Sequence, residues 1–478
     1  MGPELVLAIA AFIIMLYELI VTGDAKKAVA PWLSVIASIG ALIFAMSRIG
    51  TTVTTGVSVA VVDDFGSIFA ILLLISTILV LLFAIAMKKR QSLPYEYSYL
   101  VLFATVGAMV LATATDLITL YVGLELLSIT TYVLVALYRK SPRSSEGGLK
   151  YLIMGSIASA TILYGMSFLF GISGSTDLST ITVVMQTSFT NFPGLAYLSL
   201  ALIVVGIGVK ISAVPFHLWT ADVYEGAPTP VTAYLAVVSK AAVFALLIRL
   251  TYMAFGAEVH MWYGVIGWIA VITMIVGNFG ALAQKNVKRL LAYSSIGNAG
   301  YMLIPFAVSG LVKTTSSFTQ GLSSLLFYLF AYAFMTIGAF AIYAVVASHE
   351  QSDEVDAFAG LYKRNPWLAG TMALFLLALA GMPLTGGFVG KLMIFIAAFN
   401  AGQYWLGVVL FATSVVAFYY YFSILRAMFM TEPKSDSKSM HTPAVMHIVI
   451  VLCAVGILWL GIFPTTLSGV LGNLHWFA

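Results

Sequence analysis

The chain has 478 residues, of which 61% are hydrophobic and only 9% are charged, with a net charge of +4 and a mean hydropathy of +1.02. A soluble domain carries about 25% charged residues, so this composition excludes an ordinary soluble enzyme and predicts a polytopic membrane protein. The single cysteine, Cys453, lies in an apolar run, which excludes a disulfide framework or a cysteine-ligated cluster. Neither a GxGxxG motif, a Walker loop nor a metal-spaced histidine pair occurs, so redox or nucleotide chemistry would have to reside on partner subunits.

Apolar runs of about 20 residues recur along the whole chain. They predict an all-α integral membrane protein of about fourteen transmembrane helices, which begin near residues 3, 28, 66, 98, 117, 147, 194, 230, 262, 287, 320, 367, 403 and 443. The first run contains Glu4, is long enough to span the bilayer and is followed by Lys26 and Lys27. We therefore expect a membrane helix there, not a cleavable signal peptide.

Two of these runs contain helix-breaking residues. The seventh, residues 194–219, contains a Val-Pro step at 214–215, and the twelfth, residues 367–400, contains proline and three glycines between 381 and 387. Because proline removes a backbone donor and glycine relaxes the helix, both runs are predicted to be broken helices. An ordinary proline kink is an equally good interpretation of either run by itself, but a lysine near each break favours a functional one.

Basic residues predict the orientation of the chain. With the N-terminus outside, only Arg48, Lys313 and Arg249, at an outer helix end, would lie on the outer side. Sixteen would lie on the inner side: Lys26, Lys27, Lys88, Lys89, Arg90, Arg139, Lys140, Arg143, Lys285, Lys288, Arg289, Lys363, Arg364, Arg426, Lys434 and Lys438. This asymmetry predicts that both termini face outward.

The positions of the two breaks predict an internal repeat. Predicted helices four to eight and nine to thirteen each form a set of five, and the break falls in the fourth helix of each set. Since five is odd, the second copy would enter the membrane from the opposite side, as in inverted-repeat transporters. The predicted parts are residues 1–97 (helices 1–3), 98–255 (first repeat), 256–430 (second repeat) and 431–478 (helix 14).

Five charged residues lie within membrane-length apolar runs, namely Glu125, Lys150, Lys210, Lys240 and Lys391. A charge at the bilayer centre costs roughly 2.5–3.5 kcal/mol on insertion scales, so such residues are usually functional. Carboxylates and amines together indicate transfer of protons or small cations. Lys240 lies ten residues into its run, too deep to snorkel, and Lys210 is the expected partner of Glu125. For Lys391 a helix-end anchor remains an alternative, and for Lys150 simple snorkelling is equally plausible.

Polar residues near the first break could pass protons through water. His217 is the best candidate, although a histidine satisfied by the backbone at a helix bend fits the sequence equally well. Tyr224, Asp222 and Glu225 are expected at the inner mouth, where solvated loop acids would look the same.

Three segments resemble a known family. Residues 209–247 (VKISAVPFHLWTADVYEGAPTPVTAYLAVVSKAAVFALL), 284–301 (QKNVKRLLAYSSIGNAGY) and 379–395 (LAGMPLTGGFVGKLMIF) resemble the antiporter-like subunits of proton-pumping NADH:quinone oxidoreductase, respiratory complex I. The resemblance covers essentially the whole chain. It implies fourteen membrane helices with two inverted five-helix repeats, and the N-type subunit is the most similar.

By motif, the resemblance assigns Glu125 and Lys210 to a coupled pair, Lys240 to the central proton carrier and Lys391 to the exit position. The M-type subunit has a glutamate at that last position, and the L-type subunit has a long lateral helix after its final span, so both differ from this chain. Relatives often place a histidine where this chain has Asn298, which removes one titratable group from the route.

These features predict a proton-translocating subunit in the membrane arm of a bacterial inner-membrane enzyme. The expected partners are the bilayer, the small quinone-side subunits and the M-type subunit, with no nucleic acid. Quinone, flavin and iron–sulfur clusters would be bound by partners, with no cofactor on this chain. Two alternatives remain open: a subunit of a multi-subunit sodium/proton antiporter, and a scaffold subunit that pumps nothing.

Overall fold

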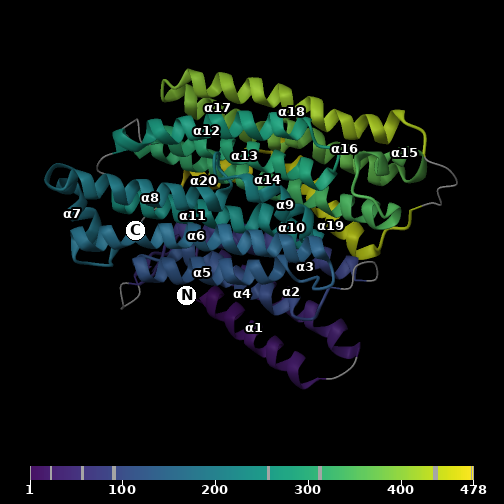
Figure 1. The fold of residues 1–478 in the computed structure, drawn as a ribbon, viewed down its shortest axis with the longest axis horizontal. Helices are drawn as coiled ribbons and strands as arrows, with labels where there is room; N and C mark the ends of the chain where they lie inside the picture. The colour runs from purple at the N-terminus through teal and green to yellow at the C-terminus, as the bar shows by residue number, and fades with distance from the viewer. Residues whose placement is uncertain are drawn as a thin grey trace.

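The computed structural model describes residues 2–21, 24–54, 59–88, 93–255, 259–309, 315–433, 440–474 and 476. Its helices lie side by side in one bundle (Figure 1), with the N-terminal helices along one edge and α17 and α18 along the opposite edge. Some of the basic residues used to predict orientation, Lys89, Arg90, Lys313, Lys434 and Lys438, lie outside the described residues.

The N-terminal part consists of three helices and a small hairpin. The two strands pair antiparallel, with Val53 opposite Val62, and are the one departure from the all-α expectation among the described residues. The elements are α1 (Gly2–Ile20), α2 (Asp24–Met46), β1 (Val53–Thr54), β2 (Val61–Val62) and α3 (Asp64–Met87).

The next part contains the first predicted break. α8 ends where Ser212 adopts a left-handed conformation (φ 66°), and a short helix, α9, continues the segment after Pro215. α7 was not predicted from the sequence. The elements are α4 (Tyr97–Thr113), α5 (Leu117–Val135), α6 (Pro142–Ser173), α7 (Leu178–Asn191), α8 (Pro193–Ile211), α9 (Leu218–Gly226), α10 (Thr229–Tyr234), a π-helical turn η1 (Leu235–Ser239) and α11 (Lys240–Phe255).

The second predicted break is also present. α16 ends at Gly381, whose φ of 96° suits glycine, and Thr385 caps α17 by accepting a hydrogen bond from Phe388 N. The elements are α12 (Val259–Leu282), α13 (Val287–Ser309), α14 (Thr315–Glu350), a 3-10 turn η3 (Val355–Phe358), α15 (Leu361–Arg364), α16 (Pro366–Ala380), α17 (Gly386–Asn400), α18 (Tyr404–Met430), α19 (Ala444–Ile462) and α20 (Thr465–Gly472).

Eleven helices among the described residues are long and apolar enough to cross a membrane. The fold class and both broken helices are therefore confirmed, whereas the count of fourteen is not. The other three predicted spans are helical as well: α4 has 17 residues, α13 begins with two cations, and the twelfth is divided into α16 and α17. The division into inverted repeats stays a prediction.

Burial separates central helices from peripheral ones. The apolar window of residues 229–255 is 100% buried and that of 318–350 is 94% buried, whereas those of α1 and α2 are 33% buried. A helix buried on all sides exposes no face to lipid. Lys240 therefore lies on the most enclosed segment of the bundle, where an ionised side chain must find its partners within the protein.

Candidate functional site: a buried lysine axis

Glu125 and Lys210 lie on facing helices but do not form an ion pair. Lys210 Nζ donates to Ser128 Oγ (2.7 Å) and to Tyr132 Oη (3.1 Å), which follow Glu125 by one and two turns on α5. Glu125 Oε1 is buried without a hydrogen-bond partner in the described chain, yet the carboxylate still acts electrostatically on Lys210. The structure thus shows the predicted pair in a separated arrangement, with the ammonium held by two hydroxyls.

Aromatic residues connect Lys210 to the centre of the bundle. Tyr132 contacts Tyr151 edge to face at 4.9 Å between ring centroids, and Tyr151 stacks on Trp219 at 4.8 Å. Tyr151 Oη also accepts a hydrogen bond from Thr131 Oγ1 at 3.5 Å. Aromatic and hydroxyl side chains therefore extend from the Lys210 ammonium into the bundle.

Lys240 is positioned by an irregular turn and held by neutral oxygens. η1 inserts a π-helical turn directly before it, a feature often found at functional sites. The side chain is 3% exposed, and Nζ donates to the carbonyl oxygen of Ser295 (2.8 Å) and to Ser295 Oγ (2.6 Å). Tyr332 Oη donates to the same Oγ at 2.9 Å, and Tyr224 Oη lies 3.4 Å from it. The ammonium thus meets acceptors that carry no formal charge.

A serine and an asparagine one turn apart on α13 continue the axis beyond Lys240. Ser294 Oγ hydrogen bonds Tyr421 Oη, and Asn298 Nδ2 donates to the Ser294 carbonyl at 2.8 Å. Tyr328 Oη donates to Asn298 Oδ1. Asn298 therefore links Ser294 and Tyr328 in one hydrogen-bonded group, although it cannot itself titrate.

A second asparagine, Asn278, belongs to a separate hydrogen-bonded group beside Lys391. Tyr420 Oη donates to Asn278 Oδ1 (3.1 Å), and Asn278 Nδ2 donates to Tyr301 Oη (3.1 Å). Lys391 Nζ lies 4.6 Å from the centroid of the Tyr301 ring, a favourable cation–π distance. The residues 294, 298 and 301 share one helical face, a spacing in YSSIGNAGY that could have identified this network from the sequence.

Lys391 binds the other half of its own broken helix. Its side chain is 5% exposed, and Nζ donates to the carbonyl oxygens of Leu379 (2.9 Å) and Ala380 (3.1 Å) and to Ser414 Oγ (3.3 Å). Leu379 and Ala380 are the last residues of α16, and the carbonyl end of a helix attracts a cation. The break therefore creates the acceptor site for the lysine.

Lys150 belongs to a separate, partly exposed cluster. Its side chain is 41% exposed, and Nζ lies 2.7 Å from both Glu146 Oε1 and Asp222 Oδ2. Arg289 completes the cluster, with Nη1 2.7 Å from Asp222 Oδ1 and 2.9 Å from Glu225 Oε2. Partial burial raises the pKa of Asp222, but hydrogen bonds from Lys150 and Arg289 outweigh that effect and hold the pKa below its usual value. We call these five residues the inner-mouth cluster.

His217 directly precedes α9, between the end of α8 and the inner-mouth cluster. It is half-buried, and Nδ1 is buried without a side-chain or backbone partner among the described residues. No hydrogen bond within the described part of the chain connects it to Lys240, so its role as a proton-transfer group stays a prediction.

Arg249, which was expected at an outer helix end, is buried and paired. Its side chain is 1% exposed and forms a two-pronged ion pair with Asp63 (2.9 and 3.0 Å). Its Nε also donates to the Ala112 carbonyl at 2.9 Å, and its guanidinium lies 4.8 Å from the Phe65 ring centroid. Asp63 caps α3, so this pair joins three helices. The distance of 186 residues between the two charges hid the contact from sequence reasoning.

Among the described residues, no three histidine, cysteine or acidic side chains gather as they would to hold a metal ion. A bundle of membrane-length helices with two interrupted helices and a buried lysine axis defines an antiporter-like membrane subunit. Residues 114–417 match the family model for NADH:quinone oxidoreductase/Mrp antiporter transmembrane proteins. The chain belongs to this family, among its N-type subunits.

Its relatives support this assignment over nearly the full length. The chain is 40% identical to NADH-quinone oxidoreductase subunit N of Paenibacillus sp. (strain JDR-2), covering 97% of this chain and 94% of that protein. It is similar, with 30% identity and a TM-score of 0.81, to a chain of respiratory complex I from Thermus thermophilus with bound aureothin, covering 98% and 99% of the two chains. A chain of the Mrp complex from Dietzia sp. DQ12-45-1b (20% identity, TM-score 0.83, 99% and 97% covered) shares the fold.

Proposed function

We propose that this protein is the N-type proton-translocating subunit in the membrane arm of a NADH:quinone oxidoreductase. The observation that carries the proposal is the pair of buried lysines, Lys240 and Lys391, that are held by hydroxyl and carbonyl oxygens and have hydrogen-bonded groups of polar side chains near them. The names of the relatives and the motif resemblance support NADH:quinone oxidoreductase as the enzyme to which the subunit belongs. Quinone, flavin and iron–sulfur clusters would be bound by its partner subunits.

The contacts support an order for the proton-transfer steps. A change of charge near Glu125 would change the partner that the Lys210 ammonium prefers. This ammonium is held by two neutral hydroxyls and can therefore reorient. Coulomb coupling across a low-dielectric interior would then alter the proton affinity of Lys240. Loss of a proton from Lys240 would pass through the Ser294, Tyr421 and Asn278 region to Lys391, the exit group.

The axis favours protons over sodium ions. Na⁺ would need several oxygen ligands without a competing cation, whereas the acceptors around Lys240 and Lys391 are already occupied by the ammonium groups. A transferred proton needs no such coordination shell. We therefore favour the oxidoreductase over the sodium/proton antiporter. We also propose that the protein lies in the bacterial inner membrane, and the distribution of basic residues favours both termini on the outer side.

Lys240→Arg tests the function directly. Arginine keeps the positive charge but does not deprotonate in proteins, so the enzyme should assemble while proton pumping falls roughly tenfold or more, as for removal of a proton-transfer group. Pumping would be followed by dye quenching in inside-out vesicles, and assembly by subunit content. Lys363→Arg is the matched control, because Lys363 is exposed and pairs with Glu432 at 3.4 Å.

Wild-type pumping by the Lys240→Arg enzyme would mean that the residue contributes charge alone. If quinone reduction and pumping are both unchanged in Lys240→Ala as well, the chain is a scaffold.

A further inference from the structure

Lys288, in the first turn of α13, is a buried lysine that the proposed proton route does not use. Its side chain is 7% exposed, although it lies beside the partly exposed inner-mouth cluster. Nζ donates to the carbonyl oxygens of Ala227 (2.8 Å) and Glu225 (3.4 Å), and these are its hydrogen bonds within the described chain. A lysine at the inner mouth is therefore held as Lys240 and Lys391 are, by oxygens that carry no formal charge.

The carbonyl end of a helix supplies the acceptors of Lys288. Glu225 lies in the last turn of α9, and Ala227 is the residue that caps this helix. The end of α16 binds Lys391 in the same way, through two main-chain oxygens. A helix end attracts a cation with only a partial charge, so loss of the proton from Lys288 leaves no hydrogen-bonded carboxylate without its cation.

Two partly exposed carboxylates lie near the Lys288 ammonium. Glu225 and Asp353 act on it electrostatically, as does the cation Arg143. The two acidic side chains are 20% and 36% exposed, and Arg143 Nη1 lies 3.7 Å from Glu225 Oε1 and 3.9 Å from Asp353 Oδ2. The carboxylates reach solvent and the lysine is buried. They are therefore titratable groups through which solvent can exchange protons with Lys288.

The helices that hold Lys288 also hold the hydroxyls around Lys240. Ser295, which accepts a hydrogen bond from Lys240, lies on the same face of α13 as Lys288, two turns farther along. The hydroxyl of Tyr224, the residue before Glu225 on α9, lies 3.4 Å from Ser295 Oγ. The rise between the two positions on α13 is about 10.5 Å at 1.5 Å per residue. α9 and α13 thus connect the inner mouth to the central lysine.

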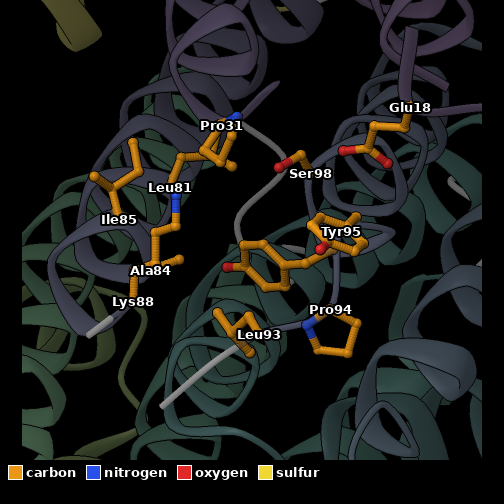
Figure 2. Close-up of a pocket in the computed structure, with 11 residues that line it drawn as sticks. Glu18, Pro31, Leu81, Ala84, Ile85, Lys88, Leu93, Pro94, Tyr95 and Ser98 are labelled. Atoms are coloured by element: carbon orange, nitrogen blue, oxygen red, sulfur yellow. The ribbon is translucent and has the colours of Figure 1, made fainter. Parts of the chain in front are cut away.

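A cavity of about 510 Å³ in another part of the bundle does not provide such a connection. Figure 2 shows its lining side chains, which come from α1, α2, α3, α4 and the segment between α3 and α4. None of its described lining residues belongs to the lysine axis or to the inner-mouth cluster. The contacts of α9 and α13 therefore favour entry of protons at the inner mouth.

We propose that Lys288 is the loading group of the proton route, through which Lys240 receives protons from the inner mouth. This step rests on the proposed function and precedes the steps given for Lys240. A proton from water would reach the Lys288 amine by way of the two carboxylates. The Lys288 ammonium would then release a proton through water and the Ser295 hydroxyl to the neutral amine of Lys240, and would itself become neutral and able to accept the next one.

Lys288→Arg tests this role. Arginine keeps the charge and can still donate to the α9 carbonyls, but it does not release its proton. The assembled enzyme should therefore lose pumping roughly tenfold or more, the scale for a proton-transfer group, whereas a residue that only anchors α9 would tolerate arginine. Dye quenching in inside-out vesicles measures pumping, and subunit content measures assembly. Lys285→Arg is the matched control, because Lys285 is exposed and lies two residues before α13, and it should pump as the wild type does.

Lys240→Arg, measured in parallel, separates this proposal from the proposed function. Because the two lysines would act in series, the double variant Lys240→Arg/Lys288→Arg should pump no worse than Lys240→Arg alone. Wild-type pumping by Lys288→Arg, or losses that multiply in the double variant, would overturn the loading role and leave the proposed function standing. Wild-type pumping by Lys240→Arg would overturn the proposed function itself.

If Lys288→Arg does not assemble, Lys288→His and Lys288→Met take its place. Histidine exchanges protons near neutral pH and methionine has no proton to exchange, so the histidine variant should pump several-fold better than the methionine variant. Equal pumping by these two variants would overturn the proposal.

Discussion

The buried lysine axis and the inner-mouth cluster hold their cations in opposite ways. Among the described residues, the hydrogen bonds of the Lys240 and Lys391 ammonium groups go to carbonyl and hydroxyl oxygens. Lys150 and Arg289 each face two carboxylates, at distances of 2.7 to 2.9 Å. The two regions contain the same kinds of cation but give them different partners.

This difference in partners distinguishes a region suited to proton exchange from a region suited to holding helices together. A lysine bound by neutral oxygens can lose its proton without leaving an unpaired carboxylate behind, so its protonation state can change at modest cost. A cation between carboxylates cannot do so, because its loss leaves buried or half-buried negative charge uncompensated. The buried axis is therefore suited to carrying protons, and the inner-mouth cluster to holding α6, α9 and α13 together.

The largest effect is expected at Lys391. Lys391→Leu removes the group that binds the end of α16 and should reduce pumping roughly tenfold or more, the scale of losing a proton-transfer residue. Lys391→Glu should retain more activity, because a protonated carboxyl can still donate to the Leu379 or Ala380 carbonyl. Pumping in inside-out vesicles measures both. Equal losses would show that the site needs positive charge and not proton exchange.

The Asp63–Arg249 pair should dominate stability. Asp63→Asn keeps an oxygen to cap α3 but leaves the Arg249 guanidinium uncompensated in a fully buried site, at a cost of about 3–5 kcal/mol. The double variant Asp63→Asn/Arg249→Met removes both charges and should recover part of the loss. Thermal dissociation of the purified complex measures the effect. A double variant less stable than either single one would contradict this account.

Glu125 and Lys210 should show weaker coupling than a direct ion pair. Glu125→Ala and Lys210→Ala should each impair quinone-coupled turnover, and the double variant should not be additively worse, since the two charges act on each other. Adding Tyr132→Phe tests the hydroxyl that holds Lys210 at 3.1 Å. Strictly additive losses in turnover would show that the Glu125 and Lys210 sites function independently.

The smallest effect is expected at Asp222. Its pKa is held below the ordinary carboxyl value, so its ion pairs stabilise the protein above that ordinary value, and this contribution is lost as the pH falls through the lowered pKa. Asp222→Asn should cost about 1 kcal/mol or less at neutral pH, as for partly exposed pairs. Thermal dissociation should differ from wild type at pH 7 and converge in acid. A constant difference across pH would exclude the ion pairs as its cause.

The sequence predicted what depends on local pattern. Apolar runs, proline and glycine located the membrane helices and both breaks, and depth in a run identified Lys240 and Lys391 as buried. It did not predict the partners of these charges, because those lie on helices far away in the chain. Lys210 donates hydrogen bonds to hydroxyls on α5 instead of to the Glu125 carboxylate, and Arg249 forms an ion pair with Asp63. α7, shorter and less apolar than a span, lacks the pattern that identified the others.

The interruption between α16 and α17 has a consequence for genetics. Two of the three groups that bind Lys391 are main-chain oxygens of Leu379 and Ala380, which any residue type would supply. Substituting either side chain leaves the acceptor in place, so an alanine scan would not report on it: position 380 is already alanine, and Leu379→Ala would record only lost packing. Natural variation there would look like ordinary drift among apolar residues. Two of the three hydrogen-bond acceptors of Lys391 can therefore be altered only by moving the backbone itself.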